Sequence, residues 1–299
     1  MLLWNRKHEI YFNLMLLPGM IMLIIFSFVP MFGLIMAFQN FVPAKGMLNS
    51  DFVGLSNFKL LFAFPDVRQM MFNTIFIAVS KIVLSILTQV FFALLLSEVF
   101  FTGFKRVIQT ICYLPNFLSW VIMAVIMLQI FSYTGMVNQV LMAFGLQEPI
   151  MFLASNTWFR PILIFTDVWK GFGFGAIIYL AAITSIDQNL YEAADVDGAT
   201  RMKKIWYITL PGIVSTVVLM STLALGNVLN AGFEQIFTMY NAAVYRTSDI
   251  IDTYVYRMGL ANLQYSFGTA VGLLKSVVSF ILIVVSYKLA DRYAGYRIF

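Results

Sequence analysis

The chain has 299 residues, of which 61% are hydrophobic and only 11% are charged, so it has too little polar surface to fold as a soluble domain. Its net charge of +5 is spread along the sequence, which argues against a nucleic-acid-binding patch and matches the inside-positive bias of membrane proteins. One cysteine, Cys112, and one histidine, His8, exclude a disulfide framework and offer no metal-ligand set.

Six apolar stretches are long enough to cross a membrane, which takes about 20 residues in a helix. An isolated span must be helical because lipid offers its backbone no other hydrogen-bond partner. We therefore predict an all-α integral membrane protein, with an N-terminal tail at 1–13 and a transmembrane domain at 14–299. The predicted spans are 14–38, 70–97, 107–130, 162–185, 212–233 and 266–288.

Prolines in the first span and three long connections predict departures from six regular helices. Pro18 and Pro30 predict a kink or broken turn in the first span, because proline removes a helical hydrogen bond. The connections 39–69, 131–161 and 234–265 are unusually long and carry many aromatic and amide side chains. These connections either fold back as interfacial helices or bind a ligand or partner, and the sequence favours neither reading.

Lysine and arginine predict the orientation of the chain. Ten of them lie in the two terminal segments, the connection 97–107 and the connection 186–211, whereas six lie in the three longer connections. Because cytoplasmic loops carry the excess of basic residues, we expect both termini and these two short connections on the cytoplasmic side.

Charged residues within spans are expensive and are candidates for function. Asp167 and Lys170 lie three residues apart on one helix, so they either pair with each other or contact a transported solute. Lys81 and Lys275 either extend to the membrane surface or form an ion pair with a carboxylate on a neighbouring helix.

Two glycine pairs, Gly171-x-x-x-Gly175 and Gly268-x-x-x-Gly272, are typical of close helix packing. Neither pair follows a predicted strand, which disfavours a ligand-binding glycine loop. We expect both faces to lie against other helices.

The connection 186–211 predicts a helical hairpin. Asp187 is placed to cap a first helix, and the pair Asp197–Gly198 is a turn signal because glycine tolerates positive φ. A second helix then runs to Pro211, which marks the start of the fifth span. Small side chains at Ala193 and Ala194 would let a partner approach closely, although a solvated connector explains the charge equally well.

The spacing within this hairpin resembles the "EAA" motif of membrane subunits of binding-protein-dependent ABC importers. The matching residues are Glu192, Ala193, Ala194, Gly198, Ile208, Leu210 and Pro211. The stretches LLPGMIMLIIFSFVPMFGLIMAFQNF, VGLSNFKLLF and YLPNFLSWVI look like the carbohydrate branch, the maltose-type permeases, and most of all like Gram-positive oligosaccharide and polysaccharide permeases.

This resemblance implies a six-helix type I importer permease in the bacterial plasma membrane. The hairpin, with Asp197 in its turn, would be a coupling helix seated in a cytosolic ATPase dimer, where Glu192 pairs with a basic residue. ATP and Mg²⁺ belong to that ATPase, since the chain has no G-x-x-x-x-G-K-[ST] sequence and is expected to be no enzyme. The other implied partners are a homologous second permease and an extracellular substrate-binding lipoprotein.

The resemblance also proposes where a sugar would pass. The stretch DVWKGFGF aligns with a span that lines the sugar site of maltose-type permeases, while the polar residues near the end of the fifth span are displaced by one position from the family's contacts. Aromatic faces and hydrogen-bonding side chains suit a sugar. The candidates are Asp167, Trp169, Lys170, Gly171, Phe174, Asn227, Asn230 and Glu234.

The leading hypothesis is that the protein imports a carbohydrate by alternating access, with an oligosaccharide as the favoured substrate. The alternative is an ATP-independent secondary transporter or channel for a polar solute, which predicts inverted repeats or a chain of buried carboxylates. No repeat is evident, and Asp167 is the one deep carboxylate.

Overall fold

The computed structural model describes residues 6–294 and confirms the all-α class. Four predicted spans agree with the structure to within a few residues. They correspond to the helical segments Tyr11–Phe38, Asp66–Ser97, Phe159–Thr184 and Tyr265–Lys288. Residues 1–5 of the predicted tail 1–13 and residues 295–299 of the predicted domain 14–299 lie outside the described residues. Arg297, one of the ten basic residues counted for the cytoplasmic side, is among them.

The first segment is irregular at its second proline. Helix α1 (Arg6–Leu23) contains Pro18 without a break and continues through the π-helical turn η1 (Ile24–Phe28), α2 (Val29–Met31) and the 3₁₀ segment η2 (Phe32–Phe38). Pro30 offers no N–H and would crowd the carbonyl four residues before it, so the helix widens there and Val29 N–H bonds to Ile24 O.

The predicted third span 107–130 contains a sharp bend. Its residues form α5 (Thr102–Tyr113), the 3₁₀ turn η3 (Leu114–Phe117) and α6 (Trp120–Ile130), and the two helical parts meet at 102°. Pro115 and two extended residues interrupt the helix, and the hydroxyl of Ser119 then accepts from Ile122 N at 3.3 Å to start α6.

The predicted fifth span 212–233 is also corrected. The helix begins at Arg201 and passes through α10 (Arg201–Lys204), the π-helical turn η5 (Ile205–Thr209) and α11 (Leu210–Gly226). It ends at Gly226, because Asn227 caps it and irregular chain follows as far as α12 (Phe233–Met239). The second arm of the hairpin and the span are therefore one continuous helix.

The long connections do fold back into short elements. A two-residue antiparallel ladder joins β1 (Gln39–Asn40) to β2 (Asp51–Phe52), with Gln39 opposite Phe52. The remaining elements there are helical: α3 (Ser56–Ala63), α7 (Met136–Ala143), η4 (Phe152–Ala154), η6 (Ala242–Val244), α13 (Tyr245–Ser248), α14 (Ile251–Val255) and η7 (Tyr256–Ala261).

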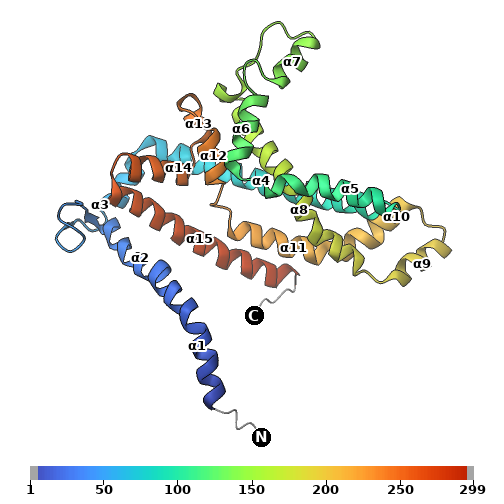
Figure 1. Cartoon of the computed structure of the whole chain (residues 1–299), viewed down its shortest axis with the longest axis horizontal. Helices are drawn as coiled ribbons and strands as arrows, with labels where there is room; N and C mark the ends of the chain where they lie inside the picture. Colours follow the sequence, from blue (N-terminus) through green and yellow to red (C-terminus); the bar gives the residue numbers. More distant parts are fainter. Residues whose placement is uncertain (1–5, 295–299) are drawn as a thin grey trace. The chain divides into compact units, whose positions relative to one another are not determined.

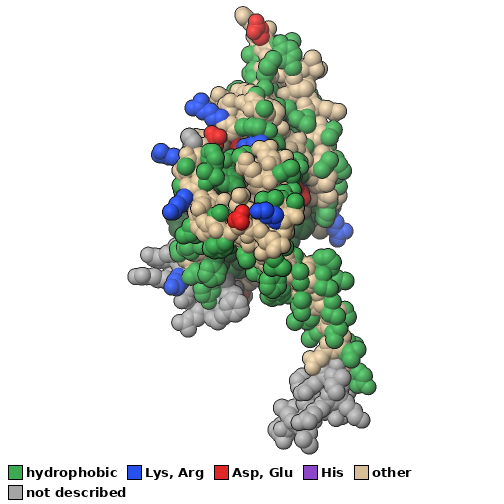
Figure 2. All heavy atoms as spheres, turned by 90° about the vertical axis from the view of Figure 1, so that its left-hand side faces the viewer, with side chains coloured by type: hydrophobic (Ala, Val, Ile, Leu, Met, Phe, Trp, Pro, Cys, Tyr) green, Lys and Arg blue, Asp and Glu red, His purple; other side chains and the backbone are tan. Residues whose placement is uncertain are grey.

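The chain divides into two compact units. The first comprises Met1–Pro65 and Val255–Leu274. Within it, a Cβ added to Gly268 would lie 2.7 Å from the Cα of Gly259, which confirms close backbone packing at Gly268, whereas a Cβ on Gly272 would meet open space. Hydrophobic side chains cover the helical segment Tyr11–Phe38, as expected for a surface in lipid (Figure 2).

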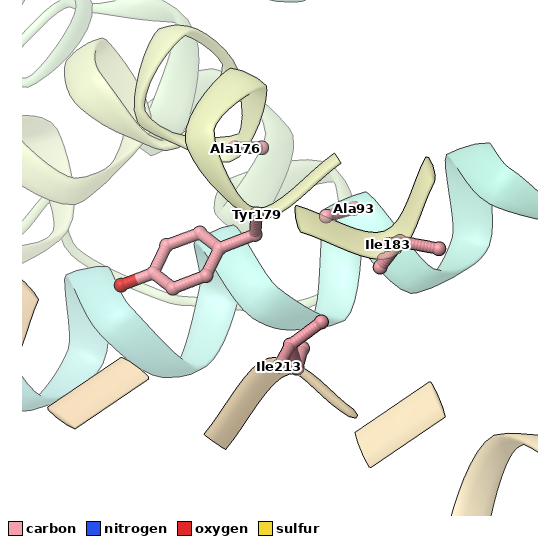
Figure 3. Packing of buried hydrophobic residues seen from close by; sticks show 5 residues of the cluster. All are labelled: Ala93, Ala176, Tyr179, Ile183 and Ile213. Carbon is pink, nitrogen blue, oxygen red and sulfur yellow. The ribbon is translucent and has the colours of Figure 1, made fainter. Parts of the chain in front are cut away.

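The second unit comprises Asp66–Tyr254 and Lys275–Phe299, and α8 (Phe159–Thr184) is its central helix. In the most apolar stretch of α8, 44% of the residues are buried, against at most 17% in the other long segments. Beside it lie α4 (Pro65–Ser97) and α11, while α9 (Gln188–Val196) and α10 lie at one end (Figure 1). Figure 3 shows the core cluster that joins these three helices: Ala93, Ala176, Tyr179, Ile183 and Ile213.

Candidate functional site

A polar cleft opens in the second unit between α4, α8, α11 and the irregular segment that follows α11. Its volume is about 320 Å³. Three of the predicted pathway residues, Asp167, Asn227 and Asn230, line it. The other polar side chains on its walls are Lys81, Ser85, Gln89 and Tyr179.

Lys81 is the buried charge of this cleft, with a side chain 7% exposed. Its ammonium donates to Ala231 O at 2.8 Å and to Gln235 Oε1 at 2.5 Å, and it forms an ion pair with Asp167 at 3.2 Å. A charge in a membrane span needs such a complete set of acceptors, because none is available from lipid. Of the two alternatives for Lys81, the structure selects a carboxylate on a neighbouring helix.

Gln235 completes this network and was missed by the sequence reasoning. It is fully buried, and its Nε2 donates to Leu163 O and to Thr166 Oγ1, both at 2.8 Å. One side chain on α12 thus ties α8 to the ammonium from α4. The predicted neighbour Glu234 is instead exposed in the first turn of α12. A lone glutamine in an aromatic stretch carries no local signal of such a role.

A second ion pair continues the polar chain away from the cleft. Lys275 on α15 (Tyr265–Ala294) contacts Asp252 Oδ1 at 2.6 Å and Asn230 Oδ1 at 2.8 Å. Asn230 also donates to Asn227 Oδ1 at 3.4 Å. Lys81 and Lys275 therefore each have a carboxylate partner. Among residues 11–64 and 66–288, no three His, Cys, Asp or Glu side chains are placed to hold a metal ion.

The other predicted residues of α8 face elsewhere. Lys170 donates to the backbone carbonyl of Asn116 at 3.0 Å and lies 5.3 Å from the Trp120 ring centre, so it braces the bend between α5 and α6. The predicted pairing of Lys170 with Asp167 is not formed, because the two side chains point to different neighbours.

The aromatic and glycine positions of α8 are also separated. Trp169 lines a different, apolar groove of about 870 Å³ between α4 and α8, and Phe174 packs edge-on against Phe117 at 5.9 Å. Gly171 faces open space, which corrects its predicted packing role, whereas a Cβ on Gly175 would strike the side chain of Gln89. The closest helix contact belongs to Gly173, which lies against the backbone of Cys112.

The hairpin forms as its local signals predict. Asp187 caps α9 (Gln188–Val196) by accepting from Asn189 N at 3.0 Å, and Asp197 ends that helix. Gly198 adopts a φ of +71°, which confirms the predicted turn, and Ala199 N–H bonds back to Ala194 O at 2.8 Å.

Interactions between its arms leave one side of the hairpin open. Asp195 forms an ion pair with Lys204 across the turn. Glu192 and Ala193 are exposed, and Ala194 is half-buried. At the base, Leu210 packs against the core cluster, Ile208 is half-buried and Pro211 follows the π-helical turn.

Comparison with known proteins places the chain among transport permeases. The family described as "Binding-protein-dependent transport system inner membrane component" matches residues 89–295. The polygalacturonan/rhamnogalacturonan transport system permease protein YteP of Bacillus subtilis (strain 168) is 40% identical over 284 residues, covering 95% of this chain and 88% of the relative. LplB of the same organism is 40% identical over 288 residues, covering 96% and 90%.

A solved structure is similar over the same length. It belongs to a bacterial ABC transporter involved in the import of the acidic polysaccharide alginate, with a TM-score of 0.88 and 37% identity, and covers 97% of this chain and 99% of that chain. The same transporter has been solved in complex with a periplasmic protein that holds an alginate pentasaccharide.

Proposed function

Because this chain belongs to the family of binding-protein-dependent transport system inner membrane components, we propose that it is the permease subunit of an ATP-driven importer that moves an oligosaccharide into the cell. The observation that carries the proposal is the exposed hairpin at Glu192 and Ala193, attached without a break to a membrane-spanning helix. A channel or secondary transporter has no need of such a docking element.

The relatives favour an acidic sugar chain as the substrate. YteP is named for polygalacturonan and rhamnogalacturonan, and the similar structure belongs to an alginate importer. We propose a uronate-containing oligosaccharide, passing the cleft lined by Asp167, Asn227 and Asn230. Amide and carboxylate groups suit the hydroxyls of such a substrate.

In the proposed cycle, Glu192 pairs with a basic residue of a cytosolic ATPase dimer, which binds ATP and Mg²⁺. Two permeases, each with a hairpin, enclose the pathway, and an extracellular binding lipoprotein delivers the sugar to the long outer connections. Residues 14–299 form the transmembrane domain, with both termini in the cytoplasm. Closure of the ATPase dimer then moves the hairpins and alternates access to the cleft.

Purification of the tagged chain from its native membranes tests docking. Wild type is expected to retain an ATPase and, in proteoliposomes, to support ATP-dependent uptake of galacturonan oligosaccharides. Glu192→Ala should lose both, because a charge-assisted contact disappears. Glu148→Ala is the matched control, since Glu148 is also exposed but lies in the connection 131–161. Uptake that proceeds without ATP, or that survives Glu192→Ala unchanged, would sink the proposal.

Substrate class has a separate test. Uptake of a galacturonan tetrasaccharide is compared with that of a neutral galactan tetrasaccharide at the same concentration, with binding protein present. Preference for the neutral chain would overturn the acidic assignment while leaving the permease assignment intact.

A further inference from the structure

A partly buried hydroxyl pair joins the exposed helix of the hairpin to the helix that enters the membrane. Tyr191 on α9 directly precedes Glu192, and its hydroxyl lies 2.9 Å from Thr209 Oγ1. Thr209 is only 4% exposed and is the last residue of the π-helical turn η5. This bond therefore connects the proposed docking surface to the most irregular turn of the following helix.

The π-helical turn η5 is explained by the proline that follows it. Pro211 has no N–H and crowds the carbonyl four residues before it, so the chain widens by one residue and Leu210 N–H bonds to Ile205 O. Thr209 Oγ1 donates to Lys204 O at 3.4 Å across the same turn. The Tyr191 and Thr209 hydroxyls share one hydrogen bond, in which either oxygen can be the donor.

Beyond the turn, the helix is held tightly against the core. Leu210 packs on the cluster that contains Tyr179 and Ile213, and Tyr179 also lines the polar cleft. A Cβ on Gly212 would lie 2.6 Å from Ile186 Cδ1, so the base of α11 packs closely on the side chain of Ile186, which follows α8. A displacement that reaches Thr209 is transmitted to the core.

We propose that Tyr191 and Thr209 are positioning residues that make α9 and α11 move together during the transport cycle. The inference rests on the proposed function, in which α9 receives the ATPase. The hydroxyl pair carries the motion of α9 directly to the widened turn, in addition to the turn at Gly198 and the Asp195–Lys204 ion pair, which join α9 to α10. Without it, the ATPase can dock and hydrolyse ATP while α11 follows incompletely.

The test measures sugar transported per ATP hydrolysed by the complete transporter in proteoliposomes, with a galacturonan tetrasaccharide and its binding protein. Tyr191→Phe and Thr209→Val each delete one hydroxyl and should lower that ratio about two- to tenfold, the factor that corresponds to one net hydrogen bond. The double variant should fall no further, because both changes break the same bond. Thr209→Ser restores the hydroxyl and should restore the ratio.

Matched controls separate this role from simple support of the fold. Tyr133→Phe removes a half-exposed phenol in the connection 131–161, and Thr222→Val removes a hydroxyl that bonds only within α11, to Val218 O at 2.8 Å. Both should keep the wild-type ratio. An unchanged ratio in Tyr191→Phe and Thr209→Val, or equal loss of ATPase activity and uptake, would overturn the positioning role of the Tyr191–Thr209 pair. Failure of Glu192→Ala to release the ATPase would instead overturn docking itself.

Discussion

Asp167 forms its ion pair with Lys81, 3.2 Å away on α4, and not with Lys170, which lies one turn along the same helix. The pair bridges two membrane helices at the wall of a polar cleft, and Gln235 supplies the ammonium with a second acceptor. Position three residues apart on a helix allows contact, but it does not decide which way each side chain turns.

This ion pair predicts a specific stability pattern. Asp167→Asn leaves a buried ammonium with weaker acceptors and should lower the free energy of unfolding by about 2 kcal/mol. The paired replacement Lys81→Met with Asp167→Leu should recover much of that loss, because no charge is left buried. Thermal unfolding in detergent measures both. Asp51→Asn is the control, since its ion pair with Lys45 is exposed and should matter little. Equal melting of Asp167→Asn and wild type would contradict the assignment.

Gly198 predicts an effect confined to coupling. With φ at +71°, an alanine there should strain the turn by roughly 1–2 kcal/mol and shift α9 relative to α10. We expect less ATPase retained on the tagged chain and slower uptake, with the membrane domain still folded. Gly103→Ala, at an open position with ordinary backbone geometry, should be silent. If the two variants behave alike, the turn does not constrain docking.

Gly171 and Gly173 lie two residues apart on α8, on different faces of the helix, and make a direct comparison. Gly173→Ala drives a methyl group into the backbone of Cys112, which cannot move as a side-chain end can, and should destabilise by about 1–3 kcal/mol. Gly171→Ala meets open space and should be neutral or slightly stabilising in a helix. Detergent melting temperatures decide between them. The reverse order would mean that α5 packs on the other glycine.

Gly232 and Gly145 share left-handed geometry, with φ of +97° and +103°, but differ in surroundings. A Cβ on Gly232 would lie 2.8 Å from Lys81 Nζ, whereas one on Gly145 would meet nothing within 4 Å. Both alanine variants carry a backbone cost of roughly 1–2 kcal/mol. Only Gly232→Ala should add the cost of displacing a pinned ammonium, seen as a larger drop in melting temperature. Equal drops in melting temperature would show that the Lys81 ammonium can move aside at no cost in stability.

Much of the secondary structure could be predicted from local sequence signals. Four spans, the cap at Asp187 and the turn at Gly198 could be predicted because each depends on residues adjacent in the chain. The bend in the third span and the early end of the fifth could not be predicted in this way, because hydropathy counts apolar residues and does not register that Pro115 and Ser119 interrupt a helix or that a helix ends at Gly226.

Only part of the candidate site could be predicted from the sequence. Asp167, Asn227 and Asn230 stand out because polar residues are rare in apolar spans, and the structure brings all three to one cleft. Trp169 and Lys170 lie in the same short stretch, yet the helix turns them toward other neighbours.

Helical membrane spans and a charged hairpin can be predicted from the chain alone, because apolar length, caps and turns are properties of contiguous residues. The contacts of Lys81 with Asp167 and with a carbonyl 150 residues away, and the role of Gln235 in their network, are seen only in the folded protein. Such partners depend on how helices pack and rotate against one another, and in lipid every buried charge must find its partner through that packing.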